Sequence, residues 1–166
     1  MPSPRDLLPE LRDPGHVVLV GMMGSGKTTV GRRVARKLDL AFVDTDAELV
    51  ATSGRSITDW FADSGEEDFR VAESKVLADA LDSPVTHVVA TGGGIVLTES
   101  NRAALCDPRH TVIWLRASPA FLASRITRKS ERTERPLLGE DPLGSLEQLD
   151  AARRDRYAMV ADMVVD

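Results

Sequence analysis

The sequence lacks the features that mark several large classes of protein. Its one cysteine, Cys106, cannot form a disulfide within the chain. No apolar run approaches the roughly 20 residues that a helix needs to cross a bilayer. Positive charge is not in excess either, because Asp and Glu outnumber Lys and Arg by 26 to 21. We therefore expect no nucleic acid or membrane partner, and a cytoplasmic location by default.

The chain is also short. Its 166 residues, 42% of them hydrophobic, are enough for one core and too few for two typical domains. The stretch Met1 to Pro14 has four prolines and mixed charges, but no apolar segment of the kind found in secretory signals. We expect residues 1–15 to form a flexible tail and residues 16–166 to form a single domain that acts as a monomer.

Five short apolar runs indicate β-strands, and the intervals between them suit helices. This alternation predicts an α/β fold, with a parallel sheet covered on both faces and ligands at the carboxyl ends of the strands. After the first run, apolar positions at helical spacing predict a helix over Thr28 to Leu38. The runs are His16 to Val20, Ala41 to Val43, His87 to Ala90, Thr111 to Leu115 and, most weakly, Met163 to Val165.

A glycine-rich segment, Gly21 to Thr28, joins the first strand to this helix and satisfies the P-loop pattern. Its glycines let backbone N–H groups point at phosphate oxygens, and the following helix adds the positive end of its dipole. We expect Lys27 to reach the β- and γ-phosphates of ATP and the Thr28 hydroxyl to ligate Mg²⁺. A mere strand-to-helix turn would explain the glycines but not Lys27 and Thr28. The expected nucleotide site includes Gly24, Ser25, Gly26, Lys27, Thr28 and Thr29.

Two aspartates, Asp44 and Asp46, stand at the end of the second expected strand. Residues two apart on an extended chain share a face, so both carboxylates would point into one cleft. Beside a nucleotide, one carboxylate can hold the metal while the other contacts an acceptor hydroxyl. The alternative is that Asp44 ends the strand and Asp46 caps a helix.

Three consecutive glycines, Gly92, Gly93 and Gly94, follow the third expected strand. Each glycine loses much backbone entropy on folding, so three in a row suggest close backbone approach to a ligand. The alternative is an ordinary tight turn, which needs only one or two glycines.

Two segments, residues 46–81 and 125–138, do not fit a minimal pattern in which single helices connect the strands. Both are candidates for mobile pieces that handle the substrates. The second is rich in basic residues, and its Arg135 could reach the transferred phosphoryl group as an arginine finger does. A solvated charged face is the alternative for Arg135, and also for Arg70 in the first segment.

Taken in order along the chain, these motifs resemble those of the shikimate kinases, within the nucleoside-monophosphate-kinase-like P-loop group. The resemblance runs from about His16 to the end of the chain, and the ordered set is much more specific than any one motif. The set consists of the P-loop, Asp44-x-Asp46, Gly65-x-x-x-Phe69-Arg70, the triple glycine, Arg135-Pro136-Leu137-Leu138 and Arg153-x-x-x-Tyr157.

The resemblance implies a three-layer P-loop kinase fold with a five-stranded parallel sheet in the order 2-3-1-4-5. Residues 46–81 would form the substrate-binding segment, and residues 125–138 the lid. The implied reaction transfers the γ-phosphoryl group of ATP to the 3-hydroxyl of shikimate, with Mg²⁺ as cofactor. Its products would be ADP and shikimate 3-phosphate, an intermediate of aromatic amino acid biosynthesis.

The resemblance also implies a role for each matching residue. Asp44 would help to organise Mg²⁺, Arg128 would lie near the adenine, and Arg135 would close over the phosphates. The catalytic residues would be Lys27, Asp46 and Arg135. Shikimate would be held by Asp46, Arg70, Gly92, Gly93, Gly94 and Arg153, with the two arginines clamping its carboxylate in a bidentate manner.

One departure from the family lies near the C-terminus. Relatives often have Pro-Leu before the tyrosine, whereas this chain has three arginines, Arg153, Arg154 and Arg156, before Tyr157. The spacing to the tyrosine favours Arg153 as the clamp. The chain ends at Asp166, where relatives usually continue into a helix.

Three other functions are compatible with a P-loop. An adenylate-type nucleotide kinase would use a similar lid, but a planar base needs a different acceptor pocket from a carboxylated ring, and Asp44-x-Asp46 argues against it. A gluconate-type kinase shares the P-loop and a two-aspartate segment, but it lacks the triple glycine and the Phe-Arg stretch in this arrangement. A nucleotide-binding regulatory module would keep the fold without the chemistry. Such a module should have lost Lys27, Asp46 or Arg135, and all three are present.

Overall fold

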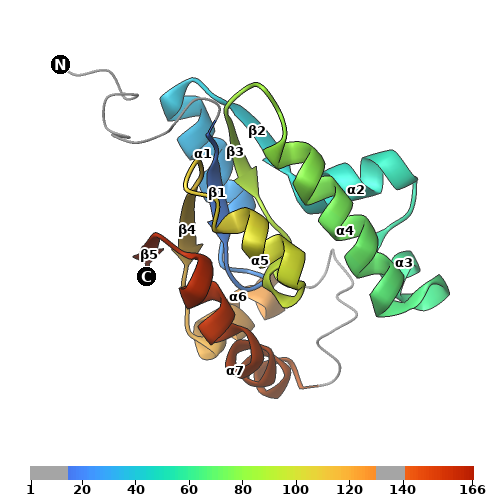
Figure 1. Ribbon diagram of the computed structural model, residues 1–166. Helices are drawn as coiled ribbons and strands as arrows, with labels where there is room; N and C mark the ends of the chain where they lie inside the picture. Colours follow the sequence, from blue (N-terminus) through green and yellow to red (C-terminus); the bar gives the residue numbers. More distant parts are fainter. Residues whose placement is uncertain (1–14, 130–140) are drawn as a thin grey trace.

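A computed structural model describes residues 15–129 and 141–166, in which all five expected strands form one parallel sheet (Figure 1). The strand order β2-β3-β1-β4-β5 confirms the prediction. The expected tail up to residue 14 and the lid residue Arg135 lie outside the described residues. The strands are β1 (Val17–Val20), β2 (Ala41–Asp44), β3 (His87–Ala90), β4 (Thr111–Leu115) and β5 (Met163–Val165).

Helices fill the intervals between the strands. The helix predicted over Thr28 to Leu38 is confirmed as α1 (Lys27–Leu38). In the expected substrate segment, the chain forms three consecutive helices, α2, α3 and α4, which extend beyond the sheet (Figure 1). The remaining elements are α2 (Thr45–Ser53), α3 (Ile57–Asp63), α4 (Gly65–Leu81), the short 3₁₀ helix η2 (Ile95–Leu97), α5 (Glu99–Leu105), α6 (Pro119–Lys129) and α7 (Pro142–Val160).

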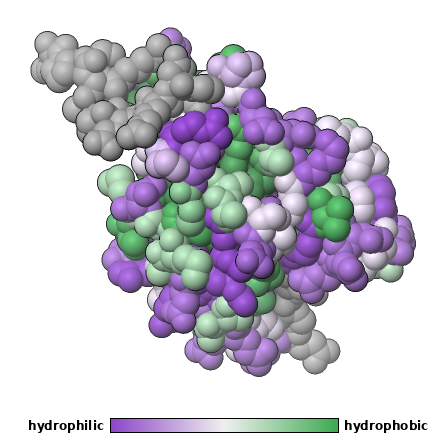
Figure 2. Space-filling view, in the orientation of Figure 1, coloured by the Kyte–Doolittle hydropathy of each residue, from purple (hydrophilic) through white to green (hydrophobic). Residues whose placement is uncertain are grey.

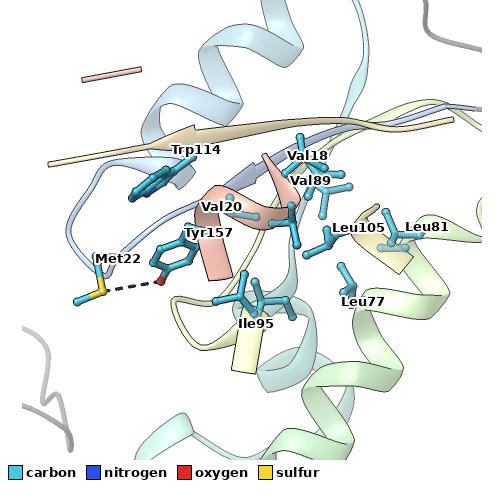
Figure 3. Close-up of a cluster of buried hydrophobic side chains, with 14 of the residues drawn as sticks. Val18, Val20, Met22, Leu77, Leu81, Val89, Ile95, Leu105, Trp114 and Tyr157 are labelled. Atoms are coloured by element: carbon cyan, nitrogen blue, oxygen red, sulfur yellow. Dashed lines mark hydrogen bonds between the residues drawn. The ribbon is translucent and has the colours of Figure 1, made fainter. Parts of the chain in front are cut away.

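Alternate residues of each buried strand point to opposite sides, so the sheet has two apolar faces. Helices cover both of them. On one side, Val18 and Val20 pack with residues of α4, α5, α6 and α7, as Figure 3 shows for part of this cluster. On the other side, Val17 and Leu19 pack against α1 around Ala35. All the residues of β1 are buried, so the P-loop that follows this strand starts from the core of the molecule.

The helices α2, α3 and α4 have a small apolar cluster of their own, built on Leu49, Phe69 and Val76. A capping box between Ser56 and Asp59 starts α3. This packing holds α2 and α3 against α4, and α4 carries Arg70 to the carboxyl ends of the strands.

The three histidines of the chain gather at the other end of the sheet. His16 precedes β1, His87 begins β3, and His110 precedes β4. The His16 ring centroid lies 5.7 Å from that of His87 and 5.1 Å from that of His110.

Polar and charged residues are spread over the face of the molecule seen in Figure 2. Of the helices in the described part of the chain, none has both the length and the apolar character needed to span a membrane.

Candidate active site

A cleft of about 420 Å³ opens at the carboxyl ends of the strands. It brings together residues that are more than 100 positions apart in the sequence, from the P-loop to α7. Of the predicted site residues with described side chains, only Ser25 does not line it. Those that do are Gly24, Gly26, Lys27, Thr28, Thr29, Asp44, Asp46, Arg70, Gly92, Gly93, Gly94 and Arg153.

The P-loop forms the floor of this cleft. Gly24 and Gly26 have φ values of 80° and 98°, in the left-handed region that glycine adopts without strain. Lys27 is only 8% exposed, and its Nζ donates hydrogen bonds to the carbonyl oxygens of Gly21 at 2.7 Å and Met22 at 2.9 Å. The Ser25 hydroxyl is buried and has no hydrogen-bond partner among the described residues. The loop therefore concentrates positive charge and donor groups at the N-terminus of α1, as an anion site requires.

Asp44 and Thr28 meet where β2 ends beside α1. The Thr28 hydroxyl donates to Asp44 Oδ2 at 2.6 Å, while Asp44 Oδ1 accepts from the backbone N–H groups of Asp46 and Ala47 at 3.2 Å each. Asp44 is thus the N-cap of α2. The alternative that Asp46 caps this helix was wrong, because the cap lies two residues earlier.

Asp46 lines the cleft from a helix and not, as the sequence argument assumed, from an extended strand. The chain is not extended at this point, since α2 begins at Thr45, so the argument from alternating strand faces does not apply. Asp46 instead lies in the first turn of α2, with its carboxylate beside Gly92. Burial raises the pKa of the Asp46 carboxyl above its ordinary value, and the nearby charge of Lys27 opposes this shift.

Arg70 points into the cleft from α4. Its side chain is only 13% exposed, and it forms ion pairs with Glu73 at 2.7 Å and Glu66 at 3.0 Å. The guanidinium also lies beside Gly94. Arg70 is therefore not part of a solvated helix face, which was the alternative left open by its charge pattern.

Glu73 is a site residue that the sequence interpretation missed. Its side chain is 2% exposed, it lines the cleft, and it holds Arg70 from the next turn of α4. Burial raises the pKa of the Glu73 carboxyl, while the Arg70 charge acts in the opposite direction. The only sequence signal was the spacing of three residues from Arg70, which places both side chains on one helix face.

The triple glycine lies in a turn, closed by a hydrogen bond from the Ile95 N–H to the Gly92 carbonyl oxygen at 3.2 Å, and it also provides clearance. The glycines with positive φ in the described residues do not include Gly92, Gly93 or Gly94. A Cβ atom on Gly92 would lie 2.5 Å from Glu73 Oε1 and 2.7 Å from Asp46 Oδ1, and one on Gly94 would lie 2.5 Å from Arg70 Cζ. The three glycines thus allow two carboxylates and a guanidinium to converge on the backbone.

Of the three arginines near the C-terminus, Arg153 is the one that lines the cleft. It is 3% exposed, and its Nη1 donates to the Gly93 carbonyl oxygen at 3.2 Å. Arg154 instead pairs with Asp150, and Arg156 donates to the Ala152 carbonyl oxygen at 2.8 Å.

Helix α6 packs against the P-loop. Side chains of Leu122 and Ile126 approach Gly24, and the Arg125 guanidinium lies beside Gly26. The predicted lid begins inside this helix, because residues 125–129 are helical. Arg128 belongs to α6, but its side chain lies outside the described part of the structure, as does all of Arg135.

The donors at the base of the cleft fit Mg²⁺ in the company of a nucleotide. Among the described residues, no three His, Cys, Asp or Glu side chains gather as a metal site. Thr28 and Asp44 supply oxygen atoms, which Mg²⁺ prefers, and Mg²⁺ usually takes its other ligands from phosphates and water. The pair therefore fits an ion that arrives with ATP.

Comparison with known proteins decides the family. The family profile described as shikimate kinase matches residues 23–166. The chain belongs to the shikimate kinase family. It is therefore an ATP-dependent phosphotransferase that acts on an alcohol.

Individual relatives agree with this assignment. The chain is 51% identical to a shikimate kinase of Symbiobacterium thermophilum over 149 residues, which cover 88% of this chain and 83% of the relative. A solved shikimate kinase from Acinetobacter baumannii, in complex with shikimate, superposes with a TM-score of 0.84 at 36% identity, over 91% of this chain and 82% of that one.

A gluconokinase from Sinorhizobium meliloti is also similar in structure. Its TM-score is 0.53 at 20% identity, over 93% of this chain and 83% of that one. A likeness at this level shows only that the two proteins share a fold.

Proposed function

We propose that this shikimate kinase family member transfers the γ-phosphoryl group of ATP to the 3-hydroxyl of shikimate, giving shikimate 3-phosphate and ADP. The observation that carries this proposal is that Lys27 of the P-loop, Asp46, the half-buried Arg70 and the buried Arg153 line one cleft. In the reaction, a bond forms between the acceptor oxygen and the γ-phosphorus. The bond from that phosphorus to the oxygen bridging the β- and γ-phosphates breaks.

The P-loop half of the cleft would hold the nucleotide. Backbone N–H groups around Gly24 and Gly26 and the N-terminus of α1 would bind the phosphates. Lys27 already has its ammonium group beside the loop, bonded to two of its carbonyl oxygens. A short movement of this side chain would bring the charge onto the β- and γ-phosphates. Arg125, beside Gly26, would add a second cation near the phosphates.

Thr28 and Asp44 would hold Mg²⁺, either directly or through water. When bound, the ion would supply charge neutralisation and orientation of the phosphate oxygens. The hydrogen bond between the two side chains keeps both oxygens at the β2 end of the cleft in advance of binding.

The α4 half of the cleft would hold the acceptor. Arg70 and Arg153 would pair with the carboxylate of shikimate, since a guanidinium matches a carboxylate at two points. Glu73 would orient Arg70 by occupying one of its N–H groups. Asp46 would accept a hydrogen bond from the reacting hydroxyl and take up its proton, and the raised pKa of its carboxyl strengthens it as a base.

The lid would complete the site. We propose that Arg135 closes over the phosphates and that Arg128 lies near the adenine. The support for both roles is the sequence motif alone. Residues 16–166 would then act as one domain, with its acceptor segment at 46–81 and its lid at 125–138. We also propose that the enzyme acts as a monomer, and its use of ATP favours the cytoplasm.

A coupled assay of ADP release with different acceptors tests the proposal. Shikimate, quinate, gluconate and nucleoside monophosphates would each be offered with ATP and Mg²⁺. We expect turnover with shikimate to exceed turnover with the others by about two orders of magnitude, because only shikimate would place its carboxylate at Arg70 and Arg153 and its reacting hydroxyl at Asp46 at the same time. Preference for gluconate would support the rival kinase. Inactivity toward every acceptor, combined with tight ADP binding, would support a regulatory module.

A further inference from the structure

The carbonyl oxygen of Gly93 is held by two side chains of α7. Arg153 Nη1 donates to it at 3.2 Å, and the Tyr157 hydroxyl donates to it from one helical turn further along. Gly93 also touches the P-loop, since a Cβ atom on it would lie 3.2 Å from the Met23 backbone nitrogen and 3.6 Å from the Gly21 carbonyl oxygen. This one peptide group therefore joins α7, the triple glycine and the P-loop.

Tyr157 is rigidly placed for this contact. Its side chain is fully buried, and its ring packs against Trp114 with 5.6 Å between the ring centroids. Figure 3 shows the phenol directed at the P-loop side of the core, with its oxygen 3.8 Å from Met22 Sδ. A thioether is a weak acceptor, so the single phenol proton goes to the Gly93 carbonyl. The ring itself does not line the cleft.

We propose that Tyr157 is a positioning residue for the acceptor site. By donating to Gly93, its hydroxyl fixes the middle of the triple glycine and lets Arg153 use its remaining N–H groups for the substrate carboxylate. Without the hydroxyl, Arg153 is the one side-chain donor that the described residues still offer to the Gly93 carbonyl. The peptide can then rotate, or it can draw the guanidinium away from the substrate. This proposal rests on the proposed function for the identity of the acceptor.

The variant Tyr157→Phe tests this role, because it removes the hydroxyl and keeps the ring. One neutral hydrogen bond is worth about 0.5–1.5 kcal/mol, so we expect the KM for shikimate to rise up to about tenfold. The KM for ATP and the melting temperature should change little. Leu81→Ala is the matched control, because Leu81 belongs to the same apolar cluster but lies away from Tyr157 (Figure 3). It should lower the melting temperature and leave the KM for shikimate unchanged.

A double-variant cycle shows whether Tyr157 acts through Arg153. The effect of Tyr157→Phe on shikimate affinity should be much smaller when Arg153 is already Lys, since residues that act as one unit are not additive. Full additivity would overturn the proposed route through Arg153. An unchanged KM for shikimate in Tyr157→Phe would overturn the positioning role altogether, and so would an equal rise in both KM values with a lower melting temperature.

Hydrogen exchange separates this proposal from the proposed function, because it needs no substrate. In the free protein, Tyr157→Phe should speed exchange at the amides of residues 92–95, while Leu81→Ala should not. If the wild type fails to phosphorylate shikimate, the proposed function fails and the exchange result still decides whether Tyr157 holds the glycine loop.

Discussion

The hydroxyl of Thr28 and the carboxylate of Asp44 are joined by a 2.6 Å hydrogen bond that ties the first turn of α1 to the end of β2. The other oxygen of Asp44 caps α2 through the backbone N–H groups of Asp46 and Ala47. One side chain therefore anchors two helices, and both helices carry groups of the cleft. This double use links the proposed metal site to the placement of Asp46.

Asp44→Asn separates these two uses of the side chain. Asn caps helices about as well as Asp, so α2 should persist and the melting temperature should change little. The lost negative charge should raise the Mg²⁺ concentration needed for half-maximal activity by about tenfold, the effect of roughly 1.4 kcal/mol. Activity would be measured over a Mg²⁺ titration at fixed ATP. As a control, Asp59→Asn changes the exposed capping box of α3 and should leave the Mg²⁺ dependence intact. An unchanged titration in Asp44→Asn would remove Asp44 from the metal site.

Lys27→Ala should nearly abolish turnover without unfolding the protein. Phosphoryl transfer depends on positioning and electrostatic stabilisation, and Lys27 is the cation nearest the carbonyl oxygens of the P-loop. The measurement is the rate of ADP release, with thermal unfolding to check the fold. Lys75→Ala is the control, because Lys75 is exposed and paired with Asp79 on α4. A remaining rate above about a tenth of wild type, a 1.4 kcal/mol effect, would contradict the assigned role.

Arg70→Lys should weaken shikimate binding although it keeps the charge. An ammonium group cannot reproduce the planar two-point contact with a carboxylate. A charge-assisted hydrogen bond is worth about 1.5–3 kcal/mol, so the dissociation constant measured by calorimetry should rise by at least about tenfold. ADP affinity is the internal control and should stay the same. If shikimate binds the variant as tightly as wild type, Arg70 serves only to pair with Glu66 and Glu73.

The histidines at the far end of the sheet predict loss of stability in mild acid. His16 Nδ1 accepts from the His87 backbone N–H at 3.1 Å, and His110 Nδ1 accepts from the His16 backbone N–H at 3.3 Å, so protonating either nitrogen breaks a bond. Burial lowers the pKa of His16 and that of His110 below their ordinary value of 6.5. The unfolded state then binds more protons just below that pH, and the free energy of unfolding should fall as pH drops through 6.5.

Urea unfolding between pH 8 and pH 5 would measure this loss. The carboxyls of Asp46 and Glu73 act in the opposite direction, because burial raises the pKa of each and favours the folded state as they take up protons. The histidine contribution is therefore the difference between wild type and His16→Gln, which should show a shallower decline with acid. Equal slopes for the two proteins would exclude His16 as the source.

Much of the fold could be predicted because its signals are local. Each strand is a short apolar run bounded by polar residues, and β1, β3 and β4 have the β-branched composition of buried parallel strands. Gly21, Lys27 and Thr28 identify the P-loop because a backbone that wraps around phosphate groups needs these residue types at a fixed spacing. The position of Arg153 followed from its spacing to Tyr157, and the structure explains that spacing, since both side chains reach Gly93 from the same face of α7.

The remaining parts of the site depend on contacts between distant segments. In the sequence, Glu73 is not distinguishable from the other acidic residues of its helix. Its role depends on the contact between α4 and the triple glycine, which are distant in the sequence. Asp46 could be placed in the cleft but not on a helix, because the cap formed by Asp44 decides where α2 begins. The glycines from 92 to 94 suggested closeness to a ligand, and the structure adds closeness to the protein's own side chains.

Arg125 was the least predictable of the cleft residues, because its sequence surroundings show only a basic segment. Leu122 and Ile126 pack on Gly24, and this packing turns the Arg125 side chain toward Gly26 at the start of α1. A guanidinium in that place should contact phosphate oxygens, so Arg125→Ala should weaken ADP binding and raise the KM for ATP by about tenfold.

The KM for shikimate should not change in Arg125→Ala, because Arg125 faces the nucleotide half of the cleft. Arg116→Ala is the control, since Arg116 is exposed and paired with Asp166 beside β5.

The variants Arg125→Ala and Arg135→Ala should differ in the kinetic constant that they change. Arg135→Ala should lower kcat by about 10³-fold, because a lid arginine acts on charge that develops in the transition state. Arg125 lies on a formed helix and should bind the phosphates equally in the ground state and the transition state, so its loss should raise KM instead. A fall in kcat with unchanged ADP affinity in Arg125→Ala would reverse that division of roles, and no effect at all would make Arg125 a solvated charge stacked on Phe121.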